Sequence, residues 1–146
     1  MEAPFHYILL RTFCYSTESE NKVREAILFI AYGKNDAEEK IEEHVLEGYF
    51  GDKIKIMKLK IENARTIKNF CLRVLPMLDI KKIDESIDED CSFHLKFSKE
   101  KALDGFIALA EDNNAVSLKG KIRVYPSCRE SAIGKIMAAV HGYHNN

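Results

Sequence analysis

The sequence lacks the features that mark secreted, membrane-spanning and zinc-binding proteins. It has only four cysteines, and no two of them form a C-x-x-C pair. The five histidines are scattered along the chain, without the Cys/His spacing of a zinc site. No apolar run approaches the length of a membrane span, and no signal peptide is recognisable at the start. We therefore expect a cytoplasmic protein with reduced thiols, no metal, no cofactor and no membrane contact.

Residues that could carry a reaction are also sparse. Gly48 and Gly51 are too few for a loop that cradles phosphate, and they fit the backbone of a turn instead. The acids at 88–90 are chain neighbours, whereas a two-metal nuclease needs carboxylates that converge from separate elements. Cys128 should lie in the first turn of the last helix, where the helix dipole lowers a thiol pKa. The sequence offers no general base beside this thiol, so we predict that the protein is not an enzyme.

The charges are segregated along the chain, although the formal net charge is only −1. Acidic residues cluster in 36–47 and in 84–90, whereas 53–60 and 117–129 contain no acid. Such sorting indicates local electrostatic surfaces, unless each charge merely solvates its own exposed face. The 146 residues, 46% of them hydrophobic, suffice to bury a core, and we expect a single domain spanning residues 1–146.

The most informative segment is 116–126, which reads V-S-L-K-G-K-I-R-V-Y-P. Its even positions are apolar apart from Gly120. Its odd positions hold Ser117, Lys119, Lys121, Arg123 and Tyr125. Because side chains alternate between the two faces of a strand, this pattern predicts a buried row and a basic row.

A second run, 53–61, repeats the pattern with Lys53, Lys55, Lys58 and Lys60. Its apolar parity shifts at Met57, as a β-bulge would produce. Together the two strands could present a basic surface to a phosphate backbone, but a bulge would turn half of one row to the other face. Lysines on exposed strands also protect a sheet against aggregation, so the pattern has a second interpretation.

The whole pattern mixes strands with helices. Strands are expected at 5–15, 41–47, 53–61, 91–97, 106–110 and 116–126. The strand at 106–110 should form a hairpin with 116–126 across the turn at 112–114. Hairpins mixed with helices indicate an α+β fold, an antiparallel β-sheet with helices packed on one face. Such a sheet leaves its other face available for binding.

Helices follow from apolar spacing and capping residues. Thr17 with Glu20 should cap the first helix, Asn63 the second, Ser98 a brief helix through Leu103, and Ser127 with Glu130 the last. The inward residues are expected to be Val23, Ala26, Ile27 and Ile30, then Ile67, Phe70, Cys71, Val74 and Leu78, then Ile80, Ile83 and Ile87 in a short acidic helix, and finally Ile133, Ile136, Met137 and Val140. Pro76 should end or kink the second helix.

Four segments carry a resemblance to a known family. They read H-Y-I-L-L-R-T-F-C-Y-S-T-E-S-E-N-K-V from His6, E-G-Y-F-G-D-K-I from Glu47, D-E-D-C-S-F-H-L-K-F-S-K-E-K-A from Asp88 and I-R-V-Y-P-S-C-R-E from Ile122. Nearly the whole chain resembles the archaeal family of predicted RNA-binding proteins, often labelled predicted exosome subunits. The resemblance implies RNA binding, a link to RNA-processing machinery, and a fold similar to the ribosomal protein that binds 5S ribosomal RNA. The family pattern has a histidine where Tyr49 stands here.

The sequence thus predicts a non-catalytic protein that binds structured or ribosomal-type RNA, in RNA processing or beside the exosome or ribosome. The expected binding residues are Lys53, Lys55, Lys58, Lys60, Lys119, Lys121, Arg123, Tyr125 and Arg129. Backbone donors at the start of the last helix add an anion site, and Tyr7 and Tyr125 offer stacking surfaces. One alternative is a protein-interaction module that docks a basic partner, such as an exosome or ribosomal protein, through the acidic patches 36–47 and 84–90. A thiol enzyme that uses Cys128 is the other.

Overall fold

The computed structural model describes residues 3–34, 41–47 and 51–144 of the chain. The predicted turn residues Gly48 and Tyr49, and the first part of the acidic patch 36–47, lie outside the described residues.

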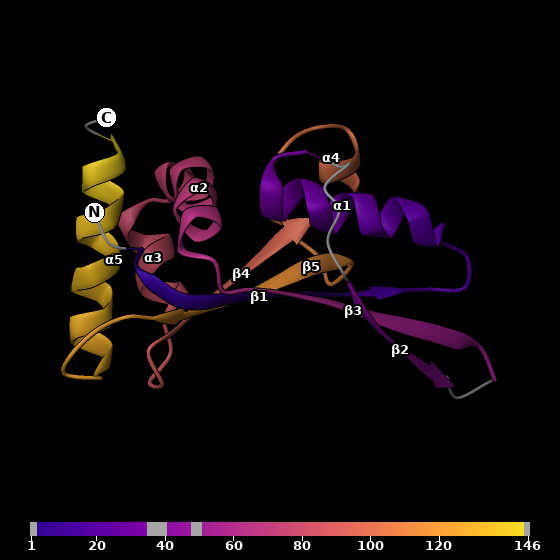
Figure 1. Cartoon of the computed structure of the whole chain (residues 1–146), viewed down its shortest axis with the longest axis horizontal. Helices are drawn as coiled ribbons and strands as arrows, with labels where there is room; N and C mark the ends of the chain where they lie inside the picture. The colour runs from indigo at the N-terminus through magenta and orange to yellow at the C-terminus, as the bar shows by residue number, and fades with distance from the viewer. Residues whose placement is uncertain (1–2, 35–40, 48–50, 145–146) are drawn as a thin grey trace. The chain divides into compact units, whose positions relative to one another are not determined.

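The described residues form an α+β fold, as the sequence predicted. In chain order the elements are β1 (Phe5–Cys14), α1 (Glu20–Tyr32), β2 (Glu42–Glu47), β3 (Lys53–Ile61), α2 (Ala64–Val74), the 3-10 helix η1 (Leu75–Met77), α3 (Ile80–Ser86), β4 (Ser92–Ser98), α4 (Lys99–Leu103), β5 (Ala115–Ile122) and α5 (Arg129–His144) (Figure 1). The strands form a five-stranded antiparallel sheet in the order β2-β3-β1-β5-β4. Within the described ranges, no helix has both the length and the apolar character that a membrane span requires.

The chain divides into two compact units. The terminal unit comprises Met1–Ile8, Ile61–Leu95 and Lys119–Asn146, and the middle unit comprises Leu9–Lys60 and Lys96–Leu118. Strands β1, β4 and β5 each begin in one unit and end in the other. Each unit is described separately below.

In the terminal unit, helix α5 packs against η1 and α3. The core is aromatic, since Phe5, Phe70 and Phe93 are fully buried and the rings of Phe5 and Phe93 lie 5.7 Å apart between centroids. Asn63 caps α2, as predicted, by accepting a hydrogen bond from the backbone N–H of Thr66 at 3.1 Å. Helix α2 ends at Val74, just before the turn that contains Pro76, which confirms the predicted break.

In the middle unit, α1 and α4 contact each other and cover one face of the sheet (Figure 1). The predicted inward residues of α1, which are Val23, Ala26, Ile27 and Ile30, are all buried. The strand residues Leu10 and Met57 of the same unit are also fully buried. Ser98 caps α4, as predicted, by accepting from the N–H of Lys101 at 3.1 Å.

Helices α1 and α5 begin later in the chain than the predicted capping residues imply. Ser19, not Thr17, caps α1, and its hydroxyl accepts from the N–H of Lys22 at 3.4 Å. At the last helix the backbone carbonyl of Cys128, not of Ser127, is the first acceptor, with the N–H of Ala132 at 3.0 Å. In both places the preceding strand ends earlier than predicted, β1 at Cys14 and β5 at Ile122, and a longer turn connects it to the helix.

Some of the predicted inward residues of α3 and α5 are not buried. Ile80 opens α3 and is 70% exposed, whereas Ile83 and Ile87 are buried as predicted. In α5, Ile136 and Val140 are buried but Ile133 and Met137 are only half-buried. The small residues Ala132 and Ala139 are buried in that helix, where they permit close packing.

The predicted hairpin between 106–110 and the basic strand is wrong. Leu109 instead bridges to Phe97 at the end of β4, and the N–H of Ala110 donates to the carbonyl of Lys96 at 2.8 Å. The reason is local: α4 ends at Leu103, and Gly105, two residues later, has a φ of 85° that turns the chain back onto β4.

Candidate nucleic-acid interface

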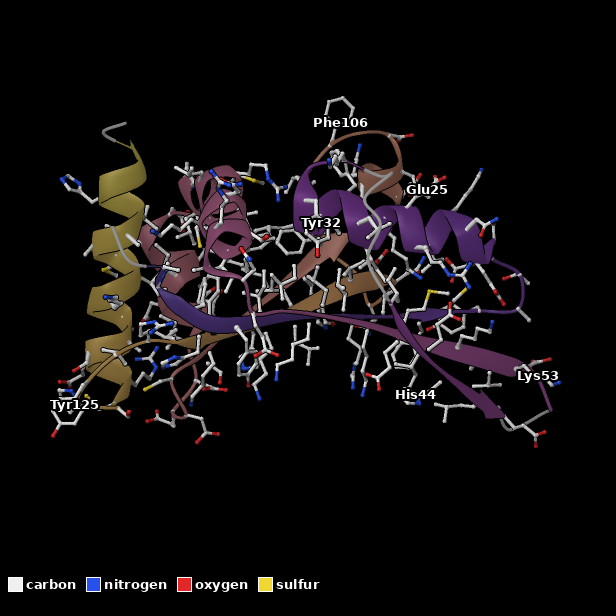
Figure 2. All side chains as sticks on the ribbon, in the orientation of Figure 1. Glu25, Tyr32, His44, Lys53, Phe106 and Tyr125 are labelled. Carbon is white, nitrogen blue, oxygen red and sulfur yellow. The ribbon has the colours of Figure 1, made fainter. Side chains whose placement is uncertain are left out.

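The sheet of the middle unit has one face covered by helices and one face without helices among the described residues (Figure 1). In β3, Met57 and Leu59 are buried on the covered face, whereas Lys58 and Lys60 point to the other face. His44 lies opposite Ile56 in the β2–β3 register, and Figure 2 shows His44 on the side of the sheet away from α1. We call this side of the middle unit the open face.

The four lysines of β3 do not share a face. The register from Glu42 opposite Lys58 to Glu47 opposite Lys53 runs without an inserted residue, so the predicted β-bulge at Met57 is wrong. Regular alternation then places Lys53 and Lys55 on the covered face, opposite to Lys58 and Lys60. The parity shift in the sequence reflects a strand with lysines and apolar residues on both faces.

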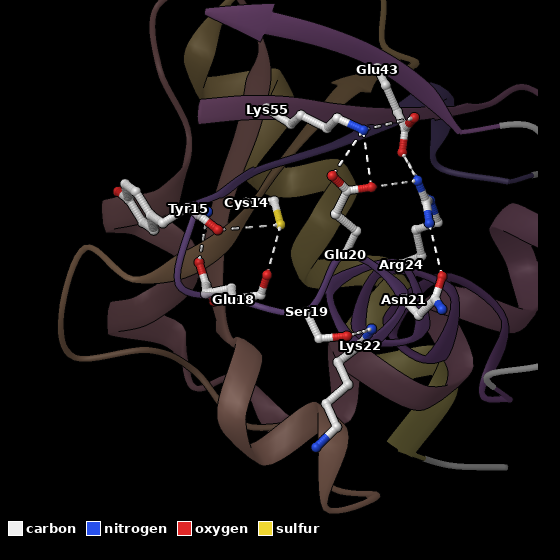
Figure 3. Close-up of polar contacts among 10 residues, drawn as sticks. All are labelled: Cys14, Tyr15, Glu18, Ser19, Glu20, Asn21, Lys22, Arg24, Glu43 and Lys55. Atoms are coloured by element: carbon white, nitrogen blue, oxygen red, sulfur yellow. Dashed lines mark hydrogen bonds and ion pairs between the residues drawn. The ribbon is translucent and has the colours of Figure 1, made fainter. Parts of the chain in front are cut away.

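Lys55 belongs to an ion-pair network on the covered face (Figure 3). Its ammonium lies 2.9 Å from a Glu20 oxygen and 4.0 Å from a Glu43 oxygen, and Arg24 pairs with both acids. The hydrogen bond from Lys55 is the largest influence on the Glu20 carboxyl and lowers its pKa, although burial acts in the opposite direction. The ion pairs of Lys55 therefore connect β3 to α1. A phosphate of RNA would have to compete with two carboxylates for the Lys55 ammonium.

In the terminal unit the basic row of β5 follows the predicted alternation. Gly120 and Ile122 are buried, whereas Lys119 is exposed and Lys121 and Arg123 are half-buried. Tyr125 follows the strand and is 95% exposed (Figure 2). The strand therefore places Lys119 and Lys121 on the face opposite to its buried residues, and Arg123 follows the end of the strand at Ile122.

The acidic patch 84–90 lies against part of this row. The ammonium of Lys121 donates to the backbone carbonyl of Asp90. The guanidinium of Arg129 donates to the carbonyl of Ile87 at 3.1 Å, the carbonyl of Asp84 at 2.7 Å and the Asp84 carboxylate at 2.9 Å. The structure thus brings together two candidate sites that the sequence had kept apart, and it gives Lys121 and Arg129 a role in holding 84–90.

Asp88 is also satisfied within the terminal unit. Its carboxylate accepts from the N–H groups of Asp90 and Ser92, both at 2.9 Å, and lies 2.7 Å from the ring Nε2 of His94. Burial alone raises the pKa of Asp88, but the bonds from His94, Ser92 and Asp90 together outweigh it and lower that pKa. Asp84 and Asp88 therefore both have intramolecular partners.

The open face carries a group of residues that the sequence analysis missed. On β1, Leu10, Thr12 and Cys14 are buried, so Arg11 and Phe13 point to the open face. Lys96 projects from the open-face side of β4 in the same way, and its ammonium lies 3.3 Å from the side-chain oxygen of Asn113. The sequence could have revealed them, because Arg11 and Phe13 occupy odd positions in a strand whose even positions from Ile8 to Cys14 are buried.

Cys128 is exposed at the start of α5, where its sulfur lies 3.1 Å from the hydroxyl oxygen of Ser131. Hydrogen bonds from the Ser131 hydroxyl and backbone N–H lower the pKa of this thiol. Burial raises the pKa of Cys14 and raises that of Cys71 to about 12. All four cysteines are free thiols. Among the described residues, no three His, Cys, Asp or Glu side chains converge as metal ligands.

We expect iodoacetamide to alkylate Cys128 well before the three buried cysteines, because the thiolate is the reactive form and Cys128 alone combines exposure with a lowered pKa. Ser131→Ala should slow this reaction severalfold at neutral pH, since the thiolate loses its hydroxyl donor. Mass spectrometry of alkylated peptides between about pH 6 and 9 measures both effects. An unchanged pH profile in Ser131→Ala would contradict this assignment.

Comparisons with known proteins point to a family described as RNA binding. A family model described as RNA binding matches residues 7–122. The RNA-binding protein PAB1135 of Pyrococcus abyssi is 28% identical over 146 residues, which cover 94% of either chain. The uncharacterized protein MJ0213 of Methanocaldococcus jannaschii is 29% identical over 93% of this chain and 97% of the relative.

Solved structures show the same fold. Mth689, a DUF54 protein from Methanothermobacter thermautotrophicus, has a TM-score of 0.82 and 27% identity over 93% of this chain and 98% of its own. AF2318 from Archaeoglobus fulgidus has a TM-score of 0.77 and 23% identity over 92% of this chain and 99% of its own. Because the family model spans most of the chain, from within β1 to the end of β5, this protein belongs to the family described as RNA binding.

Proposed function

We propose that this protein binds RNA without chemistry of its own, by neutralising phosphates with basic residues on exposed strand faces. The observation that carries the proposal is the alternation in β3 and β5, which points Lys58 and Lys60 in one unit, and Lys119 in the other, away from the buried residues. Family membership and the name of the Pyrococcus abyssi relative, an RNA-binding protein, support it. Each ammonium that contacts a phosphate releases counterions, which gives affinity without sequence selectivity.

The nine residues expected to bind RNA differ in where they lie on the strands. Lys58, Lys60, Lys119, Arg123 and Tyr125 lie on or beside exposed strand surfaces. Lys53 and Lys55 lie on the covered face, and Lys121 and Arg129 hold the segment 84–90. Phosphate contacts from Lys58, Lys60, Lys119 and Arg123 would give a slope of roughly −2.8 to −3.6 for log affinity against log salt.

We expect Lys58→Ala/Lys60→Ala/Lys119→Ala to weaken RNA binding about 10-fold or more, and to make the salt slope shallower by roughly 2 to 3. The three lysines provide phosphate contacts in the proposal, so fewer counterions are released when they are removed. Fluorescence anisotropy of labelled RNA across a salt series measures both quantities.

Lys22→Ala/Lys34→Ala/Lys101→Ala is the matched control, because it removes the same charge from exposed positions on or beside the helices of the middle unit. Its affinity should change little, and its salt slope should stay that of the wild type. Equal losses in the two variants would show that only net charge matters. Absence of binding by the wild type at low salt would refute the proposal.

The competing function is docking of a basic partner through 36–47 and 84–90. The contacts within the structure support it less well. Asp84 already pairs with Arg129, and Asp88 already pairs with His94. Several finer points stay predictions. They are a role in RNA processing, partners among exosome or ribosomal proteins, and structured or ribosomal RNA as the ligand. Likeness to the 5S-RNA-binding ribosomal protein, action as one domain and a cytoplasmic location are predictions as well.

A further inference from the structure

An aromatic and cationic stripe runs along the end of β1, from Arg11 and Phe13 on the open face to Tyr15 just beyond the strand. The guanidinium carbon of Arg11 lies 5.7 Å from the centre of the Phe13 ring. The Phe13 ring lies 6.3 Å from the Tyr15 ring, at an interplanar angle of 31°. Arg11 and Phe13 are two apart in β1, so the strand pleat carries both to the open face. Tyr15 follows the end of the strand at Cys14, and its ring continues the line because it lies beside that of Phe13. The result is a continuous series of a guanidinium and two rings.

The stripe is held in place from beneath. The ammonium of Lys99, on α4, donates to the carbonyl of Phe13 at 2.7 Å and lies 5.5 Å from the centre of the Tyr15 ring. The same ammonium contacts both carboxylate oxygens of Glu18 at 3.1 Å. Tyr15 nonetheless keeps 41% of its surface exposed, and Phe13 is half-buried. The rings are therefore oriented by fixed contacts and still accessible to a ligand.

Cations flank the stripe. The strand order places β3 beside β1, and β3 directs Lys58 and Lys60 to the open face. On the other side, beyond β5, β4 contributes Lys96 to that face. Aromatic rings on a central strand with lysines on neighbouring strands match a chain of bases joined by phosphates, because bases stack on rings while ammonium groups neutralise the backbone.

We infer that Arg11, Phe13 and Tyr15 form a stacking site for unpaired RNA bases, with Lys58 and Lys60 neutralising the adjoining phosphates. The inference rests on the proposed RNA binding and specifies its ligand as single-stranded RNA. A base in a duplex has both faces covered by its neighbours and cannot stack on a side chain, so a regular duplex cannot use this site. The site is separate from the predicted stacking residues Tyr7 and Tyr125, which belong to the terminal unit.

The test compares a labelled single-stranded oligouridylate of about 12 nucleotides with a duplex of the same length. Removing an aromatic ring that stacks on a base weakens single-strand binding by about 5- to 150-fold. We expect at least a 10-fold loss for Phe13→Leu/Tyr15→Leu. Because no cation is removed, its salt slope and its duplex affinity should equal those of the wild type. Phe106→Leu is the matched control, since Phe106 is an aromatic residue of the same unit, 64% exposed and directed away from the sheet (Figure 2).

A second measurement does not depend on how well the double variant folds. The chain has no tryptophan, so Tyr15→Trp provides a single fluorophore at the site. Oligouridylate should quench this fluorescence by stacking, and Phe106→Trp should show no quenching. Unchanged single-strand affinity in Phe13→Leu/Tyr15→Leu, or no quenching of Tyr15→Trp by bound RNA, would overturn the stacking site while leaving the lysine contacts intact. If the wild type binds neither RNA, the proposed function fails and the stacking site fails with it.

Discussion

Replacing Lys99 with methionine is expected to lower the free energy of unfolding by about 2 to 3 kcal/mol, because it breaks a buried ion pair from one side. The Lys99 side chain is 5% exposed, and its ammonium bonds the carbonyl of Phe13 and both oxygens of Glu18. Methionine keeps the apolar length but leaves the carbonyl and the carboxylate without this donor. Glu18 is 25% exposed, so water recovers part of the loss. Urea denaturation followed by circular dichroism gives the difference.

Two variants test whether the ion pair causes this loss. Lys99→Met/Glu18→Gln should be more stable than Lys99→Met alone, because the carboxylate no longer loses a counter-charge. Lys101→Met removes an exposed ammonium two residues along the same helix and should change stability by less than about 0.5 kcal/mol. If Lys99→Met matched Lys101→Met, the pair would contribute nothing measurable.

The Lys99 contacts connect stability to the proposed stacking site. One ammonium binds the backbone of Phe13, lies against the ring of Tyr15 and holds Glu18 just before α1. These groups come from the end of β1, the turn that follows it and α4, which are distant in sequence. Lys99 is therefore a positioning residue for the aromatic stripe. Its loss should reduce single-strand affinity even in the fraction of molecules that remains folded.

Local sequence patterns predicted most of the fold. The α1 and α2 cores follow from apolar spacing, the Asn63 and Ser98 caps follow from residue type, and the β5 alternation follows from parity. These features depend on neighbours within a few residues. The errors begin where a second element decides the outcome, as at 106–110, which Gly105 returns to β4 rather than to β5.

The candidate site was predicted less well, for the same physical reason. In the sequence the lysines of β3 look like one basic row, but Lys55 pairs with acids from α1 and β2. Arg129 similarly bonds to Asp84 and Ile87, more than 40 positions earlier in the chain. Such pairings join residues that are many positions apart, so no spacing rule reveals them. The stripe at Arg11 and Phe13 was missed because the strand looked apolar on both faces.

Gly120→Ala is expected to destabilise the terminal unit by about 1 to 3 kcal/mol through overpacking. A methyl group at Gly120 would lie 2.8 Å from one ring carbon of Phe5 and 2.9 Å from the next, closer than carbon atoms can pack. Phe5 is fully buried and packs on Phe93, so its ring has little room to move away. Position 120 of the basic strand therefore requires glycine, because the ring of Phe5 lies too close for a side chain. Thermal unfolding of the variant measures the loss.

The matched control is the same substitution at Gly134, in the interior of α5, where an added methyl group meets no atom within 4 Å. Alanine favours a helix over glycine by about 1 kcal/mol, so Gly134→Ala should raise stability where Gly120→Ala lowers it. Shortening the ring with Phe5→Leu should remove most of the penalty at Gly120, giving an interaction energy of about 1 kcal/mol or more in a double-mutant cycle. A cycle that sums to zero would mean that the cost of Gly120→Ala comes from the backbone and not from Phe5.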